Sequence, residues 1–382
     1  MNPHSSLAAR MNGAIDSAIA ENRLVGTVVL VAQDGEIVYR RAAGFLDREA
    51  GSRMPEDAIF RLASISKPFV TAAAMHLVER GVIALEHPVT RWLPDFRPAL
   101  ADGTRPEITI RELLTHTSGL SYGFLEPEDG PYRRLDVSDG LDQPGLSMAE
   151  NLRRLAGAPL AFAPGTAWRY SLGIDVIGAV LEAATGKSLA DVIRDRVTGP
   201  LDLVDAGFSV TDPSRLATPY ADGPKGPVRM DGTVGVPLPP QVGDGAVLFT
   251  PQRVFDTASY LSGGAGMVGT ATDVLALLET IRLGGAPILT PQTVAAMMRD
   301  QVGPQAQTQG PGWGFGYGWA VLDDPALTGT PQAKGTLQWG GAYGHSWFVD
   351  PARRLSVVAL TDTAFEGMGG RFVLDVRDAV YG

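Results

Sequence analysis

The sequence predicts an α/β (α+β) protein with one antiparallel sheet built from both ends of the chain and flanked by helices. Strand patterns occur near the N-terminus and again after residue 313, whereas helical patterns fill the middle. With 382 residues, 45% of them hydrophobic, the chain can bury a substantial core. We therefore expect a sheet domain from residues 1–84 and 254–382, a mainly helical inserted domain at 85–253, and a cleft where the two meet.

The N-terminal part begins with a helix and a hairpin. Apolar residues recur every four positions across residues 7–21, which predicts a helix. The β-branched run 26–32 predicts a strand, and an Asp34-Gly35 turn leads into a second strand at 37–40.

A third element is the apolar segment 64–80, which predicts a helix. Gly81 follows it at the position where glycine commonly ends a helix. Pro68 falls in the first turn, where its missing N–H costs little.

The remaining elements follow the same logic. Helical segments separated by Pro/Gly-rich loops are predicted at 110–116, 148–155, 174–185 and 189–196. Further on, the patterns predict a helix at 272–283, strands within 313–322, 336–348 and 355–361, and a closing helix at 372–381.

Composition narrows the possible partners. The net charge of −10 and the absence of basic runs argue against nucleic acid. No apolar run approaches the roughly 20 residues that span a bilayer, and the N-terminus lacks the pattern of a secretory signal. The chain has no cysteine, which fits a reducing compartment. We therefore expect a cytoplasmic protein without a membrane partner, and its oligomeric state stays open.

The most informative motif is Ser64-Ile65-Ser66-Lys67, the only Ser-x-x-Lys in the sequence. Residues three apart share one face of a helix, so the Ser64 hydroxyl and the Lys67 amine can meet. A serine becomes a nucleophile when a neighbour accepts its proton, and a buried lysine can do so as the free amine. Taken alone, Ser64 would equally fit a helix N-cap.

Tyr170 lies at a loop-to-helix corner, just before the helix expected at 174–185. From there its phenol can project into a cleft and act as a base beside a positive charge such as that of Lys67. A half-buried tyrosine that holds the loop is the alternative.

A third motif, Trp339-Gly340-Gly341, lies among strand-forming residues. Glycines in a strand commonly mark a bulge or a close approach of another backbone. An edge strand here would present one N–H beside Ser64, and the Ser64 N–H would supply the second donor of an oxyanion hole. A tight bend is the alternative.

Together these motifs resemble those of the family VIII carboxylesterases, esterases similar to class C β-lactamases and DD-peptidases. Ser64 to Lys67 matches the S-x-x-K motif, Tyr170-Ser171-Leu172 the Tyr motif and Trp339-Gly340-Gly341 the W-G-G box. The run Leu113 to Leu120 (LLTHTSGL) is similar to one common in the wider superfamily, and the similarity covers nearly the whole chain.

The resemblance implies a β-lactamase/DD-peptidase-like fold and a role for each motif. Ser64 would be the acylated nucleophile, and Lys67 with Tyr170 would form the base; which of the two holds the proton at rest stays open. Ala342, after the W-G-G box, would donate its N–H beside that of Ser64. No cofactor is implied.

Two departures from the β-lactamase pattern bear on the substrate. Leu172 stands where those enzymes have an asparagine, and Trp339 stands in place of the lysine of K-T-G, which helps bind the lactam carboxylate. The resemblance therefore implies a preference for neutral esters. Tyr122, Phe124 and His345, together with Trp339, Gly340 and Gly341, are candidate substrate-binding residues. His116 is expected to be structural.

We therefore expect a serine carboxylesterase that hydrolyses short-chain acyl esters through an acyl-enzyme, with acyl transfer to alcohols as a further activity. A β-lactamase or DD-peptidase, an acyltransferase of synthetase type and a non-catalytic ligand-binding protein are the alternatives. The segment Gly344 to Phe348 fails the G-x-S-x-G pattern at its fifth position, which disfavours a Ser-His-Asp hydrolase. No group of residues has metal-ligand spacing, so no metal is expected.

Overall fold

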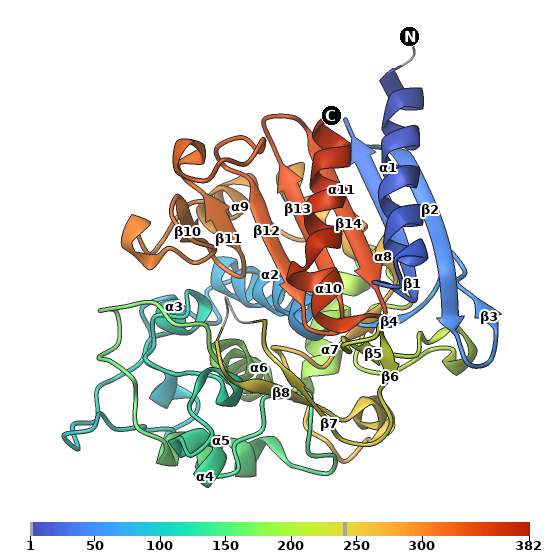
Figure 1. The fold of residues 1–382 in the computed structure, drawn as a ribbon. Helices are drawn as coiled ribbons and strands as arrows, with labels where there is room; N and C mark the ends of the chain where they lie inside the picture. The colour runs from blue at the N-terminus through green and yellow to red at the C-terminus, as the bar shows by residue number, and fades with distance from the viewer. Residues whose placement is uncertain (1–2, 240–242) are drawn as a thin grey trace.

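The apolar run Gly26–Gln33 forms strand β1, which lies inside an eight-stranded sheet in the computed structural model (Figure 1). The structure describes residues 3–239 and 243–382. β1 pairs antiparallel with β2 (Glu36–Asp47) and, on its other side, with β14 (Leu355–Thr361) near the C-terminus. The predicted antiparallel sheet built from both ends of the chain is thus confirmed.

The sheet order is β10-β11-β12-β13-β14-β1-β2-β3. The remaining strands are β3 (Ser52–Arg53), β10 (Trp313–Phe315), β11 (Ala320–Leu322), β12 (Leu337–Gly341) and β13 (His345–Asp350). The predicted strand patterns at 313–322 and 336–348 are each a hairpin of two strands. Gly318 and Gly344 have φ values of 95° and 115° at the two turns, a region that favours glycine.

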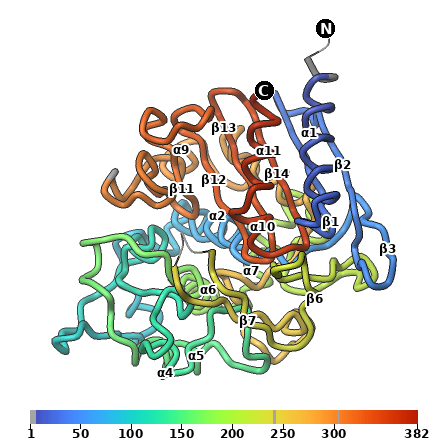
Figure 2. The backbone as a smooth tube through the Cα atoms, viewed as in Figure 1, coloured from blue at the N-terminus to red at the C-terminus, as the bar shows by residue number. Residues whose placement is uncertain are grey.

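Helices cover both faces of the sheet because side chains alternate along each strand. Val29 and Val31 of β1 point to a layer formed by α1 (Pro3–Ala20) and α11 (Arg371–Tyr381). Val28 and Leu30 point to the opposite layer. That layer contains α2 (Ser66–Glu79) and α8 (Ala271–Arg282). Figure 2 shows the first and last helices side by side on one face of the sheet.

Most of the other helices are short and lie in the middle of the chain. They are α3 (Ile110–Leu114), α4 (Pro131–Arg134), α5 (Met148–Gly157), α6 (Gly173–Thr185), α7 (Leu189–Ile193), α9 (Pro291–Met297) and α10 (Ala364–Gly369). The predicted helix at 189–196 divides into α7 and a wider turn at Arg194–Thr198.

In the part of the chain that the structure describes, three small antiparallel pairs lie outside the main sheet. They join β4 (Phe60–Arg61) to β9 (Val268–Gly269), β5 (Tyr220–Ala221) to β6 (Val228–Arg229), and β7 (Val234–Pro237) to β8 (Ala246–Phe249). Strands of two to four residues are too short to show the alternation that identifies a strand in a sequence. The middle of the chain therefore holds more strand than its sequence indicated, and the domain boundaries stay a prediction.

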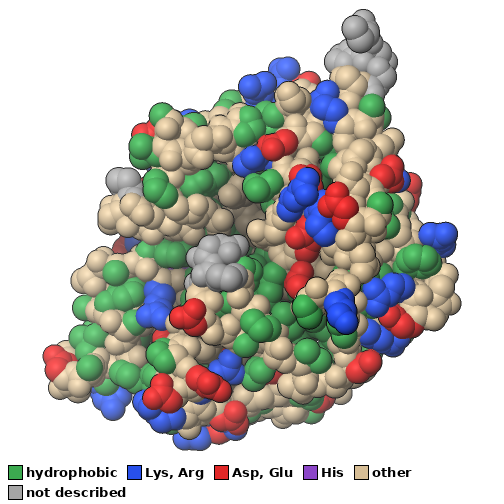
Figure 3. Space-filling model, in the orientation of Figure 1, with side chains coloured by type: hydrophobic (Ala, Val, Ile, Leu, Met, Phe, Trp, Pro, Cys, Tyr) green, Lys and Arg blue, Asp and Glu red, His purple; other side chains and the backbone are tan. Residues whose placement is uncertain are grey.

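Within the described residues, no helix is long and apolar enough to cross a bilayer. Acidic and basic side chains are interspersed over the face drawn in Figure 3 rather than gathered into one basic patch.

Candidate active site

Ser64 lies in a tight helical turn, Ala63–Ile65, that leads directly into α2. Ala63 has a φ of 45°, a left-handed conformation that costs a residue with a Cβ roughly 1–2 kcal/mol. The turn is held by the 265–267 loop, because the Leu62 N–H donates to the Met267 carbonyl and the Met267 N–H donates to Ser66 Oγ, at 2.9 and 3.0 Å. Backbone strain of this kind gathers at functional sites.

The Lys67 amine faces Ser64 from the first turn of α2. Lys67 Nζ donates to Ser64 Oγ at 3.1 Å and to the Gly264 carbonyl at 2.8 Å. The side chain is fully buried, and no carboxylate of residues 3–239 or 243–382 lies within ion-pair distance of it. The expected meeting of hydroxyl and amine is therefore present in the structure.

Tyr170 reaches the same point from the loop before α6. Its Oη lies 2.7 Å from Ser64 Oγ, and Lys67 Nζ lies 4.7 Å from the centre of its ring. Trp339 of β12 donates from Nε1 to Tyr170 Oη at 3.3 Å. The Ser64 hydroxyl and the Lys67 amine thus meet the Tyr170 phenol, which comes from a distant segment of the chain. The indole N–H of Trp339 reaches the phenol from a third segment.

His116 lies directly behind Tyr170. Its ring is 4.9 Å from the Tyr170 ring, its Nδ1 is 3.0 Å from Ser171 Oγ, and its carbonyl accepts the Arg169 N–H at 2.9 Å. Burial, with a smaller effect from the Lys67 charge, holds the pKa of His116 well below its usual value, so the imidazole is neutral. His116 therefore contacts Arg169 and Ser171, the residues on both sides of Tyr170, as well as the Tyr170 ring.

The W-G-G box brings the backbone of β12 against the turn that carries Ser64. A Cβ on Gly341 would lie 2.5 Å from the Leu62 carbonyl oxygen, so only glycine fits. Beyond it, the N–H groups of Ala342 and Ser64 donate to no other group of the described chain. These two N–H groups therefore stay available to an oxyanion.

The expectation that this strand is an edge strand needs correction. β12 lies between β11 and β13, but β11 pairs only with Leu337 and Gln338. Trp339, Gly340 and Gly341 pair with β13 alone. The strand is interior at its start and behaves as an edge at the site, because β11 is only three residues long.

Aromatic rings pack around Tyr170 at the site. Tyr122 and Phe124 stack with their ring centres 4.7 Å apart, and the Tyr122 ring lies 4.9 Å from Tyr170 and 5.3 Å from Lys67 Nζ. The Trp339 ring lies 5.0 Å from Tyr170 on another side. We call Tyr122, Phe124 and Trp339 the aromatic wall; its rings are uncharged and suit neutral acyl and alcohol groups.

His345 is not part of this group, contrary to its place among the candidate substrate-binding residues. It is buried, its Nε2 lies 2.8 Å from the Arg61 carbonyl oxygen, and its ring packs edge-on against Phe60. Burial lowers the pKa of His345 to about 4. The side chain therefore supports the strand that leads to Ser64 and does not face a substrate.

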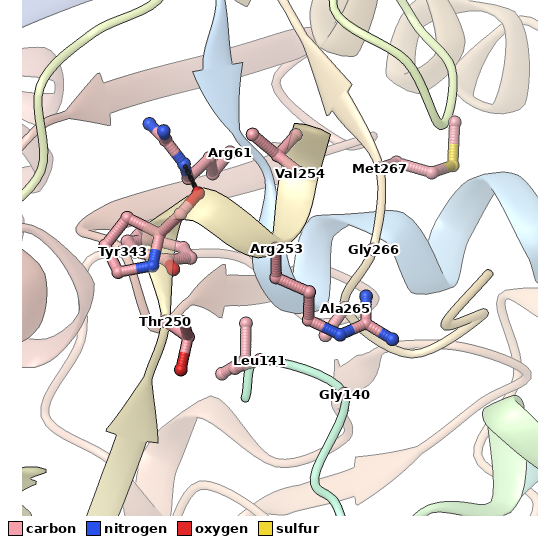
Figure 4. Close-up of a pocket in the computed structure, with 11 residues that line it drawn as sticks. Arg61, Gly140, Leu141, Thr250, Arg253, Val254, Ala265, Gly266, Met267 and Tyr343 are labelled. Atoms are coloured by element: carbon pink, nitrogen blue, oxygen red, sulfur yellow. Dashed lines mark hydrogen bonds between the residues drawn. The ribbon is translucent and has the colours of Figure 1, made fainter. Parts of the chain in front are cut away.

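A separate cavity of about 30 Å³ lies on the other side of the 265–267 loop (Figure 4). Arg61, Arg253 and Tyr343 line it, whereas Ser64, Lys67 and Tyr170 do not. Figure 4 shows the two guanidinium groups pointing in different directions, so they do not converge on one anion. A cavity of this size holds a water molecule or two and no ester.

No cluster of three or more potential metal ligands occurs in residues 3–239 and 243–382.

Among the functional candidates, sequence reasoning missed the buried Asp139. Its carboxylate accepts the backbone N–H groups of Gly123 and Phe124. Its local sequence, Ser138-Asp139-Gly140, is typical of an ordinary turn and gave no signal.

Comparisons with known proteins agree with this geometry. The chain is 57% identical over 378 residues to Esterase EstB of Burkholderia gladioli, covering 99% of this chain and 96% of that protein. The solved structure of EstCE1, a hydrolase with promiscuous acyltransferase activity, superposes with a TM-score of 0.98 at 51% identity over 100% of both chains. Unliganded simvastatin synthase from Aspergillus terreus shares the fold, with a TM-score of 0.77 at 23% identity over 98% of each chain.

A family model described as Beta-lactamase matches residues 11–379, nearly the whole length. With this match and the EstB identity, the chain belongs to the beta-lactamase family.

Proposed function

We propose that this protein is a serine carboxylesterase of the family VIII type that works through a covalent acyl-serine. The observation that carries the proposal is the convergence on Ser64 Oγ of Lys67 Nζ at 3.1 Å and Tyr170 Oη at 2.7 Å. Its similarity to Esterase EstB and to the hydrolase EstCE1 supports ester hydrolysis as the reaction.

In the first half of the reaction, Ser64 Oγ attacks the ester carbonyl carbon while its proton passes to the coupled Lys67–Tyr170 pair. The carbonyl oxygen becomes an oxyanion, which accepts hydrogen bonds from the Ser64 and Ala342 N–H groups. As the C–O bond to the alcohol breaks, the pair returns the proton to the leaving alkoxide. The products are an acyl-Ser64 ester and the free alcohol.

In the second half, water takes the place of the alcohol. The Lys67–Tyr170 pair accepts a proton from water, whose oxygen attacks the acyl carbonyl, and then protonates Ser64 Oγ as it leaves. Because Trp339 donates to Tyr170 Oη and not to Ser64, it orients the phenol in both halves.

The aromatic wall supports short, neutral acyl esters as substrates and aryl or alkyl alcohols as leaving groups. The wall also favours acyl transfer, because an apolar alcohol that binds to it can compete with water for the acyl-enzyme. The promiscuous acyltransferase activity of EstCE1 supports this second activity. Ester formation from vinyl acetate and benzyl alcohol in buffer tests it, and hydrolysis alone would contradict it.

Hydrolysis of p-nitrophenyl butyrate together with labelling by a fluorophosphonate tests the proposal. We expect turnover and stoichiometric labelling of the wild type, and neither in Ser64→Ala. An unlabelled protein would instead favour the non-catalytic alternative. Nitrocefin turnover faster than ester turnover would favour the β-lactamase alternative, which Trp339 and Leu172 disfavour.

The cytoplasmic location stays a prediction that cell fractionation tests.

A further inference from the structure

The loop that carries two residues of the aromatic wall is held by a carboxylate. Asp139 Oδ1 accepts the Gly123 N–H at 2.7 Å, and Asp139 Oδ2 accepts the Phe124 N–H at 3.2 Å. The approach is close, since a Cβ on Gly123 would lie 3.0 Å from Oδ2. One side chain thus fixes the backbone between the stacked rings of Tyr122 and Phe124.

The burial of Asp139 needs an explanation. The residue is 6% exposed and has no ion-pair partner in the described chain, although an unpaired buried carboxylate is costly. A second buried acid, Asp142, follows three residues later and adds repulsion, while Arg133 of α4 gives partial compensation. Burial, followed by the Asp142 charge, raises the pKa of Asp139 to about 7.

The residues before the loop are held independently of Asp139. The Ser121 N–H donates to Tyr132 Oη at 2.7 Å, and the Ser121 carbonyl accepts the Leu172 N–H at 3.2 Å. Leu172 lies two residues after Tyr170. The hydrogen bond from Leu172 to Ser121 therefore keeps Tyr170 and the start of the loop in place even without the Asp139 carboxylate. Asp139 therefore fixes the loop at Gly123 and Phe124, whereas Arg169 Nη2 holds the next residue by donating to the Leu125 carbonyl at 2.9 Å.

We propose that Asp139 is a positioning residue that holds the aromatic wall in place and so sets how tightly esters bind. The inference rests on the proposed esterase function and deepens it. Loosening the loop moves the surface that contacts acyl and alcohol groups, whereas Ser64, Lys67 and Tyr170 keep their mutual contacts. The effect therefore falls on KM and leaves kcat largely unchanged.

Asp139→Asn tests the proposal, because the amide keeps the shape of the side chain and offers one acceptor in place of two. We expect KM for p-nitrophenyl butyrate to rise roughly tenfold, the equivalent of one charge-assisted hydrogen bond. We expect kcat to change less than about twofold. Asp142→Asn is the matched control. Asp142 is equally buried, but its Oδ1 accepts from Ser138 Oγ at 2.6 Å and does not contact the loop, so KM should be unchanged.

A second readout uses the wild type and does not depend on a variant folding. Below pH 7 one oxygen of Asp139 carries a proton and accepts hydrogen bonds poorly, so KM should rise as the pH falls through about 7. The other titratable groups that face Asp139 are Asp142, Arg133, Tyr122 and Tyr132. Burial raises the pKa values of both tyrosines, which keeps them neutral in this range. Asp142→Asn should retain the step but move it to a lower pH, because this variant removes the charge that helps to raise the pKa of Asp139. Asp139→Asn should lose the step.

The inference would be overturned, with the esterase function intact, by an unchanged KM in a folded, fluorophosphonate-labelled Asp139→Asn or by a wild-type KM that is flat between pH 6 and 8. A fall in kcat without a change in KM would also overturn it, since that would place Asp139 in the chemical step. Failure of the wild type itself to label would instead reject the proposed function.

Discussion

Trp339 Nε1 lies 3.3 Å from Tyr170 Oη, so the first residue of the W-G-G box donates a hydrogen bond to the phenol that we propose as part of the base. The hydrogen bond couples the strand of the W-G-G box to the phenol beside Ser64. The donor in this contact is the uncharged indole N–H of Trp339.

Trp339→Phe keeps a ring in the aromatic wall but removes the N–H. We expect kcat for p-nitrophenyl butyrate to fall about tenfold, the value of a hydrogen bond of roughly 1–1.5 kcal/mol. Trp339→Lys should lose ester hydrolysis without gaining nitrocefin hydrolysis, because Leu172 is unchanged. A Trp339→Phe enzyme with wild-type kcat would show that the bond to Tyr170 contributes nothing.

Ala342→Pro removes one of the two N–H groups assigned to the oxyanion. We expect kcat to fall about 10²–10³-fold, as when one such donor is lost from other enzymes. Ala342→Gly keeps the N–H and serves as the control, with a kcat close to that of the wild type. Circular dichroism spectra establish that both variants are folded, and equal activities of the two would remove Ala342 from the mechanism.

His116→Phe removes the contact with Ser171 Oγ and leaves a bulky residue at a φ of 58°. We expect the free energy of unfolding to fall by about 1–2 kcal/mol and kcat to fall with it. His116→Asn should recover most of both, because asparagine tolerates this backbone conformation and its amide can replace Nδ1. Urea unfolding and ester kinetics measure the two effects. Equal losses in both variants would contradict a specific role for the Ser171 contact.

Buried histidines should make the protein sensitive to acid. The pKa of His345 is about 4 in the folded protein, against 6.5 when exposed, so the unfolded chain binds the proton more readily between these values. Its contribution to stability is complete above pH 6.5 and is lost as the pH falls towards 4. Between pH 7.5 and 5 the loss amounts to about 2 kcal/mol.

Urea unfolding of the wild type and His345→Gln at these two pH values measures that contribution. We expect the variant to be less stable at pH 7.5 but to lose about 2 kcal/mol less on acidification. Identical pH dependences for His345→Gln and the wild type would contradict the prediction.

Much of the fold followed from local patterns. The helix spacing at the N-terminus, the Asp34-Gly35 turn and the β-branched runs are local signals, and the structure contains the corresponding elements. The strand patterns at 313–322 and 336–348 do not show where each hairpin turns, because the turns at Gly318 and Gly344 are identified only by their backbone conformation. The two-residue strands around Tyr220 carry no periodicity at all.

The site, like the fold, has some features that the sequence predicts and others that it does not. Ser64 and Lys67 are neighbours on one helical turn, so their meeting could be read directly from their spacing, and the motif of Tyr170 supplied the third group. Asp139 and the support given by His116 could not be inferred, because each acts through contacts with segments distant in sequence. His345 was placed in the site because it follows the W-G-G box, but the next strand turns its ring towards Arg61.

The pairing of β1 with β14 has a consequence for biosynthesis. Thr27 lies opposite Thr361, so β1 can complete its pairing on this side only after a segment far later in the chain has been made. Until then the edge of β1 that faces β14 has no partner. The sheet that carries the W-G-G box is therefore completed late, because contacts between residues so far apart in sequence form slowly.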